Sequence, residues 1–285
     1  MMILSTAPAL IAPTSAPGGG LPMVAATLVL YALAAVPLPA QAALRRLAPL
    51  TLLGGWVLQA FLLVADIGGV GLAGPGARLG FAPVLSLTVW LVIGVYTVES
   101  RFVPLPGVRQ WLAVAGLLVV AVCAVFPGEL RPITSRLAPL HFALGVGSYA
   151  LFGAAVLHGL LLDAAERRLR AGAPRPAPPG QALGLPLLQL ERLTFRFVEA
   201  GFVTLSGAIV LGLLTTTQWQ LWGDHKAVFS IFAWLVFAGL LLGRRLRGWR
   251  GRRATGWLYA GTVLLLLAYA GSRFVLEVVL GRAPG

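Results

Sequence analysis

The chain has 285 residues, of which 58% are hydrophobic and 11% are charged, and its formal net charge is +13. A soluble domain of this length cannot hide so much apolar surface, because much of any folded surface faces water. The composition therefore predicts a polytopic membrane protein. The single cysteine, Cys123, excludes a disulfide framework and gives no support to a zinc or iron–sulfur site.

The amino-terminal segment, residues 1–20, lacks a basic region, and Pro8, Pro13 and Pro17 interrupt its apolar stretch. This pattern is not typical of a cleaved signal peptide. We interpret the segment as a flexible tail on the outer side of the membrane. The remainder of the chain, residues 21–285, is expected to form a single membrane domain.

Eight apolar runs follow, each a candidate transmembrane helix. They cover residues 21–39, 48–65, 81–98, 111–126, 137–162, 197–216, 227–242 and 256–275. Pro37 and Pro39 predict a kink or an early end of the first span. Residues 171–184 are rich in proline and are expected to be an inner linker. The predicted fold class is all-α, a membrane bundle of about eight transmembrane helices.

Most of the 22 basic residues fall in loops on one side of these spans, with a dense cluster at residues 244–253. Basic residues are retained on the cytoplasmic side, so this asymmetry predicts that both termini lie outside. The same residues explain the high net charge, because they stand at membrane edges where anionic lipid headgroups are found. The sequence therefore predicts contacts with the lipid bilayer and no nucleic-acid partner.

Residues 219–226, Trp-Gln-Leu-Trp-Gly-Asp-His-Lys, form a polar and aromatic island between two apolar runs, predicted on the outer face. Trp219 and Trp222 are candidate contacts for a porphyrin, and His225 is a candidate iron ligand. Asp224 is a candidate orienter of the ligand or the loop. Two other interpretations stay open, since tryptophans gather at membrane interfaces without a ligand and Asp224 is equally a candidate helix N-cap.

His141 stands at the start of the fifth span, on the same predicted face as His225. The small residues Gly145 and Gly147, with Ser148, would let a neighbouring helix or a flat ligand approach the backbone closely. His141 is therefore a candidate metal ligand. Taken alone, the same pattern also fits an interfacial histidine bonded to water or to a loop carbonyl.

His158 lies on the same span as His141, roughly 25 Å further along a helix, so the two cannot bind one iron. It is either a second ligand site or a satisfied core histidine. Two other charged residues, Glu199 and Arg273, lie within spans, and Glu277 follows the last span by two residues. Glu199 fits an interfacial position, whereas Arg273 and Glu277 can pair at helical spacing and could contact a propionate or a partner helix.

This set of residues resembles the integral membrane cytochrome c assembly family (CcsA/CcmC-like), most closely its YpjD/HemX-like branch. The resemblance covers residues 137–280, and the first half of the chain matches in hydropathy only. The features that carry it are His141 with Ser148 and Tyr149, residues 190–193, residues 219–226, residues 229–234 and residues 271–277.

The resemblance implies a haem platform made by a tryptophan-rich outer loop that ends in Trp-Asp, with axial histidines on flanking outer segments. By position, His141 matches the first flanking histidine, and Trp219, Trp222 and Asp224 match a shortened platform. The sequence departs from the family at the outer end of the last span, which lacks the second histidine. His225 is the candidate substitute.

These observations favour a haem-binding or haem-handling protein of the bacterial inner membrane that supports cytochrome c assembly or haem homeostasis from its outer face. Its expected partners are haem, other membrane assembly proteins and the lipid bilayer, and it is expected to be a carrier or chaperone without catalytic residues. The alternative is a cofactor-free membrane scaffold or regulator that keeps the fold. A solute transporter would predict an internal repeat, and the sequence has no convincing one.

Overall fold

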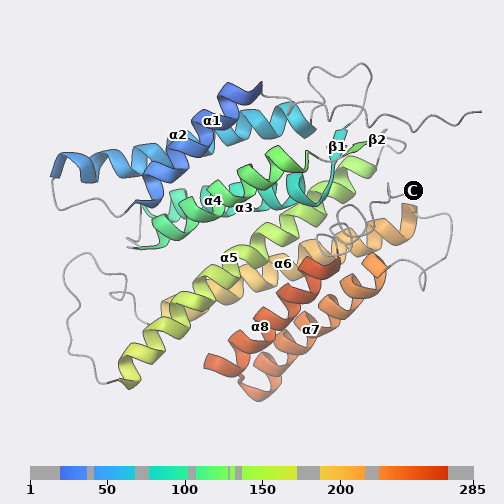
Figure 1. Cartoon of the computed structure of the whole chain (residues 1–285). Coiled ribbons are helices and arrows are strands. Elements are labelled where there is room, and N and C mark those ends of the chain that lie inside the picture. The colour runs from blue at the N-terminus through green and yellow to red at the C-terminus, as the bar shows by residue number, and fades with distance from the viewer. Residues whose placement is uncertain are drawn as a thin grey trace, which may run out of the picture.

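A computed structural model describes residues 20–36, 42–67, 77–101, 107–127, 129–131, 137–171, 187–215 and 225–268 of the chain. Within these residues the fold is built from α-helices, with one small pair of strands (Figure 1). In chain order the elements are α1 (Gly20–Ala35), α2 (Ala42–Ile67), β1 (Ala77–Leu79), α3 (Phe81–Glu99), α4 (Val108–Val125), β2 (Glu129–Arg131), α5 (Ala138–Arg170), α6 (Leu187–Thr215), α7 (His225–Arg247) and α8 (Gly251–Leu266).

Each of the eight predicted spans coincides with one of these helices, which confirms the helical membrane bundle. Six of the described helices are long and apolar enough to cross a membrane, and α1 is a shorter apolar helix. The last predicted span, residues 256–275, runs beyond the described residues. The outside position of both termini and the number of spans remain predictions.

The helices extend further at their arginine-rich ends than the apolar runs predicted. α5 continues to Arg170, α6 begins at Leu187 and α7 continues to Arg247. Charged side chains do not stop a helix, because arginine and glutamate are good helix formers that can lie outside the hydrocarbon. An apolar run therefore marks the part of a helix that is suited to lipid, whereas the helix itself ends later.

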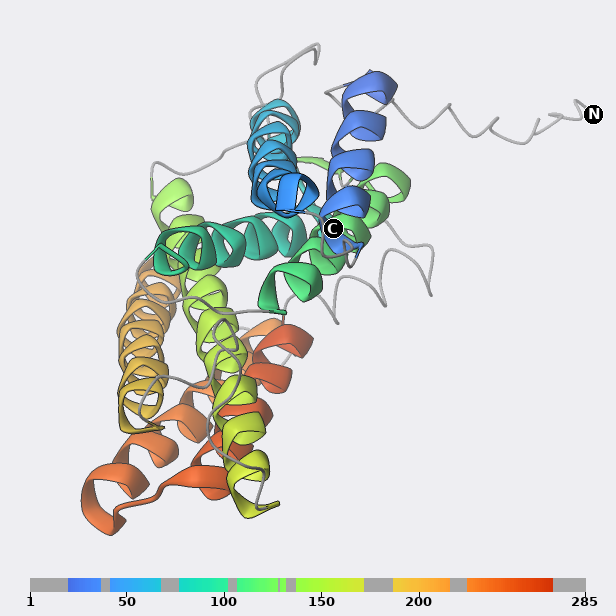
Figure 2. The same cartoon turned by 90° about the vertical axis from the view of Figure 1, so that its left-hand side faces the viewer.

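Two hydrophobic cores divide the molecule into two four-helix bundles. The first core lies among α1 to α4 and includes Tyr31 and Ile93, and the second lies among α5 to α8 and includes Phe152 and Phe237. Figures 1 and 2 show the first four helices together in the upper part of both views, with α7 and α8 below them and the amino end of α5 rising to the level of α3. The two bundles meet where α3 packs against α5.

Buried polar side chains tie the first bundle together. Trp56 on α2 and Trp90 on α3 stack with their ring centroids 4.8 Å apart, and each indole N–H donates to the other residue's carbonyl, at 2.8 and 2.9 Å. Tyr31 donates to the side-chain carbonyl of Gln59, whose amide donates to the carbonyl and hydroxyl oxygens of Ser86. A buried polar group without a partner is costly, so these bonds fix the register of α1, α2 and α3.

The strands β1 and β2 pair antiparallel, with Ala77 opposite Arg131 and Leu79 opposite Glu129. They belong to the connections before α3 and after α4, outside the predicted spans. Backbone N–H and C=O groups in such connections need partners, and a short ribbon supplies them. A three-residue strand is too short to show as an alternating pattern in the sequence.

Candidate functional site

His141 lies in the first turn of α5 and is exposed. Its ring Nδ1 is 3.0 Å from the main-chain carbonyl oxygen of Ala208 on α6. α5 and α6 are antiparallel neighbours, which brings the start of one helix beside the last turns of the other. The position of the imidazole is therefore set by a contact between residues 67 apart in sequence.

This contact also decides which ring nitrogen carries the proton. A carbonyl oxygen can only accept a hydrogen bond, so Nδ1 of His141 must be the donor. In the neutral ring Nε2 then holds a lone pair, and no described residue hydrogen-bonds it. A donor bond from one nitrogen to a carbonyl, with the other nitrogen free to ligate, is the usual arrangement of a metal-bound histidine. The donor chemistry of His141 therefore fits an axial ligand of haem iron.

Gly212 provides the space that the His141 ring occupies. A Cβ atom at Gly212 would lie 3.1 Å from Cε1 of His141 and 3.6 Å from its Nδ1. Any side chain here would press on the ring, so the close approach of the imidazole to α6 depends on this residue being glycine.

The same end of α5 presents open backbone. No described atom lies within 4 Å of the position that a Cβ would take at Gly145 or at Gly147. Gly145 follows His141 by one helical turn, so both lie on one face of α5. Ser148 is buried and its hydroxyl donates to the Gly145 carbonyl at 2.7 Å. Among the described residues, nothing covers the backbone of Gly145 and Gly147, and the close approach of a flat ligand beside His141 stays a prediction.

The other predicted haem contacts lie at or beyond the edge of the described structure. Trp219, Trp222 and Asp224 fall in residues 216–224, which lie outside the described residues. His225 is the first residue of α7, and its side chain is also outside them. The amino ends of α5 and α7 and the carboxyl end of α6 lie toward the same end of the molecule (Figure 1). This places the backbone of both candidate ligands at that end, whereas their separation stays untested.

His158 is buried, with its side chain 1% exposed, and is held by polar contacts within the protein. Among the described residues, no three histidine, cysteine or acidic side chains are close enough to hold a metal ion. The surroundings of His158 agree with the interpretation of a core histidine.

The charged residues at the other end of α5–α8 form ion pairs that the sequence did not reveal. Arg244 on α7 donates to Glu191 on α6 at 3.3 Å, and Arg250 lies 3.8 Å from the same carboxylate. Glu199 is exposed and lies 3.8 Å from Arg245, so it pairs across α6 and α7, and its position at a membrane interface stays a prediction. Arg273 and Glu277 lie outside the described residues.

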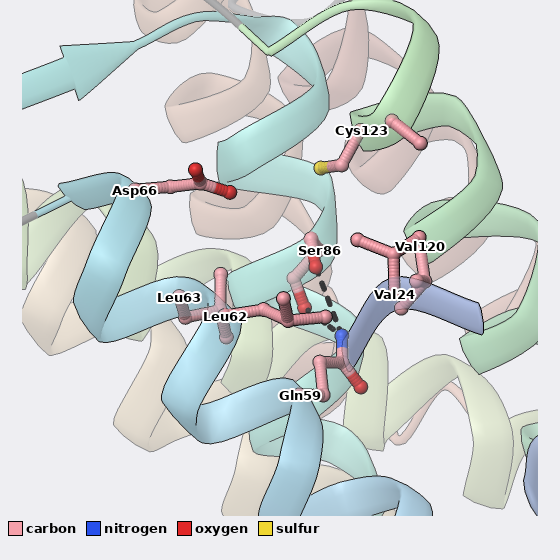
Figure 3. Close-up of a pocket in the computed structure, with 9 residues that line it drawn as sticks. Val24, Gln59, Leu62, Leu63, Asp66, Ser86, Val120 and Cys123 are labelled. Atoms are coloured by element: carbon pink, nitrogen blue, oxygen red, sulfur yellow. Dashed lines mark hydrogen bonds between the residues drawn. The ribbon is translucent and has the colours of Figure 1, made fainter. Parts of the chain in front are cut away.

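A small cavity, lined mainly by apolar side chains, lies between α1, α2, α3 and α4 (Figure 3). Asp66 and Ser86 point into it opposite Cys123, with the Gln59 amide below. The space suits a molecule the size of water and is far too small for a porphyrin. One sequence signal could have found it, because Gln59 and Asp66 are two helical turns apart in an otherwise apolar run and so share one face.

Comparison with known proteins gives a family match over most of the chain. The family described as cytochrome C assembly protein matches residues 79–280. The inner membrane protein YpjD of Escherichia coli (strain K12) is 35% identical over 141 residues, which are 49% of this chain and 52% of that protein. The cytochrome c biogenesis protein CcsA of Synechococcus sp. (strain RCC307) is 26% identical over 187 residues, or 64% of this chain and 50% of that protein.

A further relative is the cytochrome c biogenesis protein CcsA of Prochlorococcus marinus (strain MIT 9515), 34% identical over 94 residues, which are 30% of this chain and 29% of that protein. The chain thus spans about half the length, or less, of these curated relatives. No solved structure matches the chain.

Proposed function

Because the chain belongs to the family of cytochrome c assembly proteins and is a multi-pass protein of the inner membrane, we propose that it binds or passes haem at its outer face. In this role it would support cytochrome c assembly or haem homeostasis. Relatives named cytochrome c biogenesis proteins support the proposal. The alternative, a cofactor-free scaffold, would bind no haem. A haem-binding experiment therefore distinguishes the two functions.

The observation that carries the proposal is the state of His141. Its Nδ1 donates to the Ala208 carbonyl, and its Nε2 keeps the lone pair that a metal requires. The ring is exposed at a helix end, with the open backbone of Gly145 one turn away. This arrangement leaves Nε2 available to a metal, as a ligand requires.

Four further residues complete the proposed site. Trp219 and Trp222 would pack against the porphyrin, Asp224 would orient the loop or a ligand, and His225 would be a second axial ligand. His225 begins α7 at the end of the molecule where α5 also begins. These assignments rest on the sequence pattern and on the family.

We propose a carrier or chaperone and not an enzyme. Haem, when bound, supplies an iron that accepts imidazole nitrogens. His141 and His225 together would hold the iron within the protein, whereas His141 alone would leave the iron accessible to a ligand from a partner. Neither arrangement needs a general acid, a base or a nucleophile from the protein.

Replacing Gly212 with alanine is expected to weaken haem binding by about 10-fold, since residues that orient a metal-bound histidine typically contribute about 10–100-fold in affinity. The new methyl group would lie 3.1 Å from Cε1 of His141 and turn the ring away from the Ala208 carbonyl. The measurement is a haem titration of the detergent-purified protein, followed at the Soret band.

Gly207→Ala is the matched control on the same helix. A Cβ at Gly207 would make ordinary contact with Leu144, at 3.5 Å, and would not reach the histidine. Its haem affinity should equal that of the wild type. Equal affinity of Gly212→Ala and the wild type would show that the ring position against α6 has no part in binding. Absence of any Soret band in the wild type would contradict the proposed function itself and favour the scaffold.

A further inference from the structure

The contact between the two four-helix bundles contains a buried acid–histidine pair. His158 lies on α5 and Glu99 is the last residue of α3, the helix of the first bundle that packs against α5. Nε2 of His158 is 3.1 Å from Oε2 of Glu99, and the two side chains are 1% and 19% exposed. Both residues fall toward the predicted inner side of the membrane, far along α5 from His141.

The second nitrogen of His158 limits the protonation states that this pair can adopt. Nδ1 is 2.8 Å from the carbonyl oxygen of Ala154, one turn earlier on α5, and a carbonyl only accepts. Nδ1 therefore carries a hydrogen. The atoms that face each other across the bundles are then Nε2 and a carboxylate oxygen, and without a further proton both present lone pairs.

One added proton resolves this conflict. It can stand on Nε2, giving an imidazolium beside a carboxylate, or on Glu99, giving a carboxylic acid that donates to a neutral ring. Glu99 Oε2 is buried and accepts no well-aligned hydrogen bond from any described group. A buried carboxylate oxygen without a donor is strongly destabilising. The need for a donor at Oε2 thus points to a proton as the missing partner.

The helices of the second bundle bring no competing charge to the ring. α6 contributes Phe197, whose ring centroid is 5.2 Å from that of His158. α8 contributes Tyr259, which lies against Gly159 and donates its hydroxyl to Asp163 at 2.9 Å. Asp163 also accepts from Thr255 at 2.9 Å, so this carboxylate is engaged with α8.

The remaining charged groups near these helices are directed elsewhere. On α6, Arg196 and Glu199 are exposed, and Glu199 pairs with Arg245. On the side of the first bundle, Arg101 is exposed just after α3. Arg109 lies in the first turn of α4 and is half-buried. Among the described residues, no arginine or lysine forms an ion pair with Glu99.

We propose that His158 and Glu99 are a proton-binding site, in which one shared proton holds the α1–α4 bundle against the α5–α8 bundle. The proton is taken from water when the pair forms and returns to water or hydroxide when the pair deprotonates. Deprotonation leaves a lone pair facing a buried carboxylate, which favours separation of α3 from α5. The pair thus stabilises the folded protein while the proton is bound. This stabilisation is lost at the higher pH at which the proton is released.

The test is the thermal unfolding of the detergent-purified full chain between about pH 6 and pH 10, a range that spans the titration of an ordinary histidine. Glu99→Gln is the informative variant, because the glutamine amide N–H can donate to Nε2 of the neutral ring and the amide does not titrate in this pH range. The unfolding temperature of the wild type should fall relative to that of Glu99→Gln as the pH rises. Subtracting the two curves removes titrations that both proteins share.

Two further variants complete the test. His158→Ala leaves the buried carboxylate without a partner and should lower the unfolding temperature at neutral pH by roughly 6 °C or more. Glu166→Gln removes a carboxylate that pairs with Arg170 within α5, and it should keep the wild-type pH dependence. The proposal is overturned if Glu99→Gln and the wild type lose stability in parallel, or if His158→Ala unfolds at the wild-type temperature.

Discussion

Replacing His141 with alanine is expected to lower haem affinity by more than about 100-fold, since even groups that only orient a metal ligand contribute about 10–100-fold. The variant should lose most of its Soret absorbance when haem is supplied at micromolar concentration. Its helical content should not change, because the His141 side chain is exposed and makes one described hydrogen bond. Haem titration and far-ultraviolet circular dichroism on the same samples measure both quantities.

A second variant, His141→Gly, tests whether haem binding is lost because the iron ligand is missing or because the packing around residue 141 has changed. In His141→Gly, added imidazole can occupy the space of the lost ring, and it should restore the Soret band without any change in the protein. Imidazole should have no such effect on the wild type. Full haem binding by both histidine variants would show that the iron ligand lies elsewhere.

Replacing Phe237 with alanine is expected to lower the free energy of unfolding by about 3–5 kcal/mol, the usual cost of removing a buried phenylalanine. Phe237 is fully buried at the centre of the second bundle and stacks on Phe152 with ring centroids 3.7 Å apart. α8 lies close to the same ring, since a Cβ at Gly261 would be only 2.8 Å from it. Thermal or denaturant unfolding of the detergent-solubilised protein measures the loss.

Phe232→Ala is the matched control for this variant. Phe232 lies on the same helix and is 54% exposed, as a side chain that faces lipid would be. Its removal should change the stability much less, because no packed cavity is left behind. Equal losses for the two variants would contradict the packing of α5 to α8 around Phe237.

The eight helices could be predicted from the sequence because the membrane imposes a length and a polarity on each span. The early end of α1 at Ala35 also follows from the sequence, since Pro37 disfavours a helical conformation in the preceding residue. The extension of α5 to Arg170 could not be predicted from apolar runs, because the charged residues at this end of the helix interrupt the run before the helix ends. The β1–β2 ribbon was missed because three residues carry no periodic pattern.

The candidate site was predictable in part. The place of His141 at a helix start was visible in the sequence, as were the small residues that follow it. Its contacts with Ala208 and Gly212 were not, because they depend on how α6 packs beside α5. The pair of Glu99 and His158 was hidden for the same reason, since α3 and α5 meet only in the folded chain.

Haem binding by this chain can be read from the absorption spectrum of the detergent-purified wild-type protein, supplied with haem and recorded oxidised and reduced. We expect a Soret band in both states and sharp α and β bands on reduction, as for iron held by imidazole. A spectrum that shows only free haem would rule out haem binding and leave a membrane scaffold with the fold of the family.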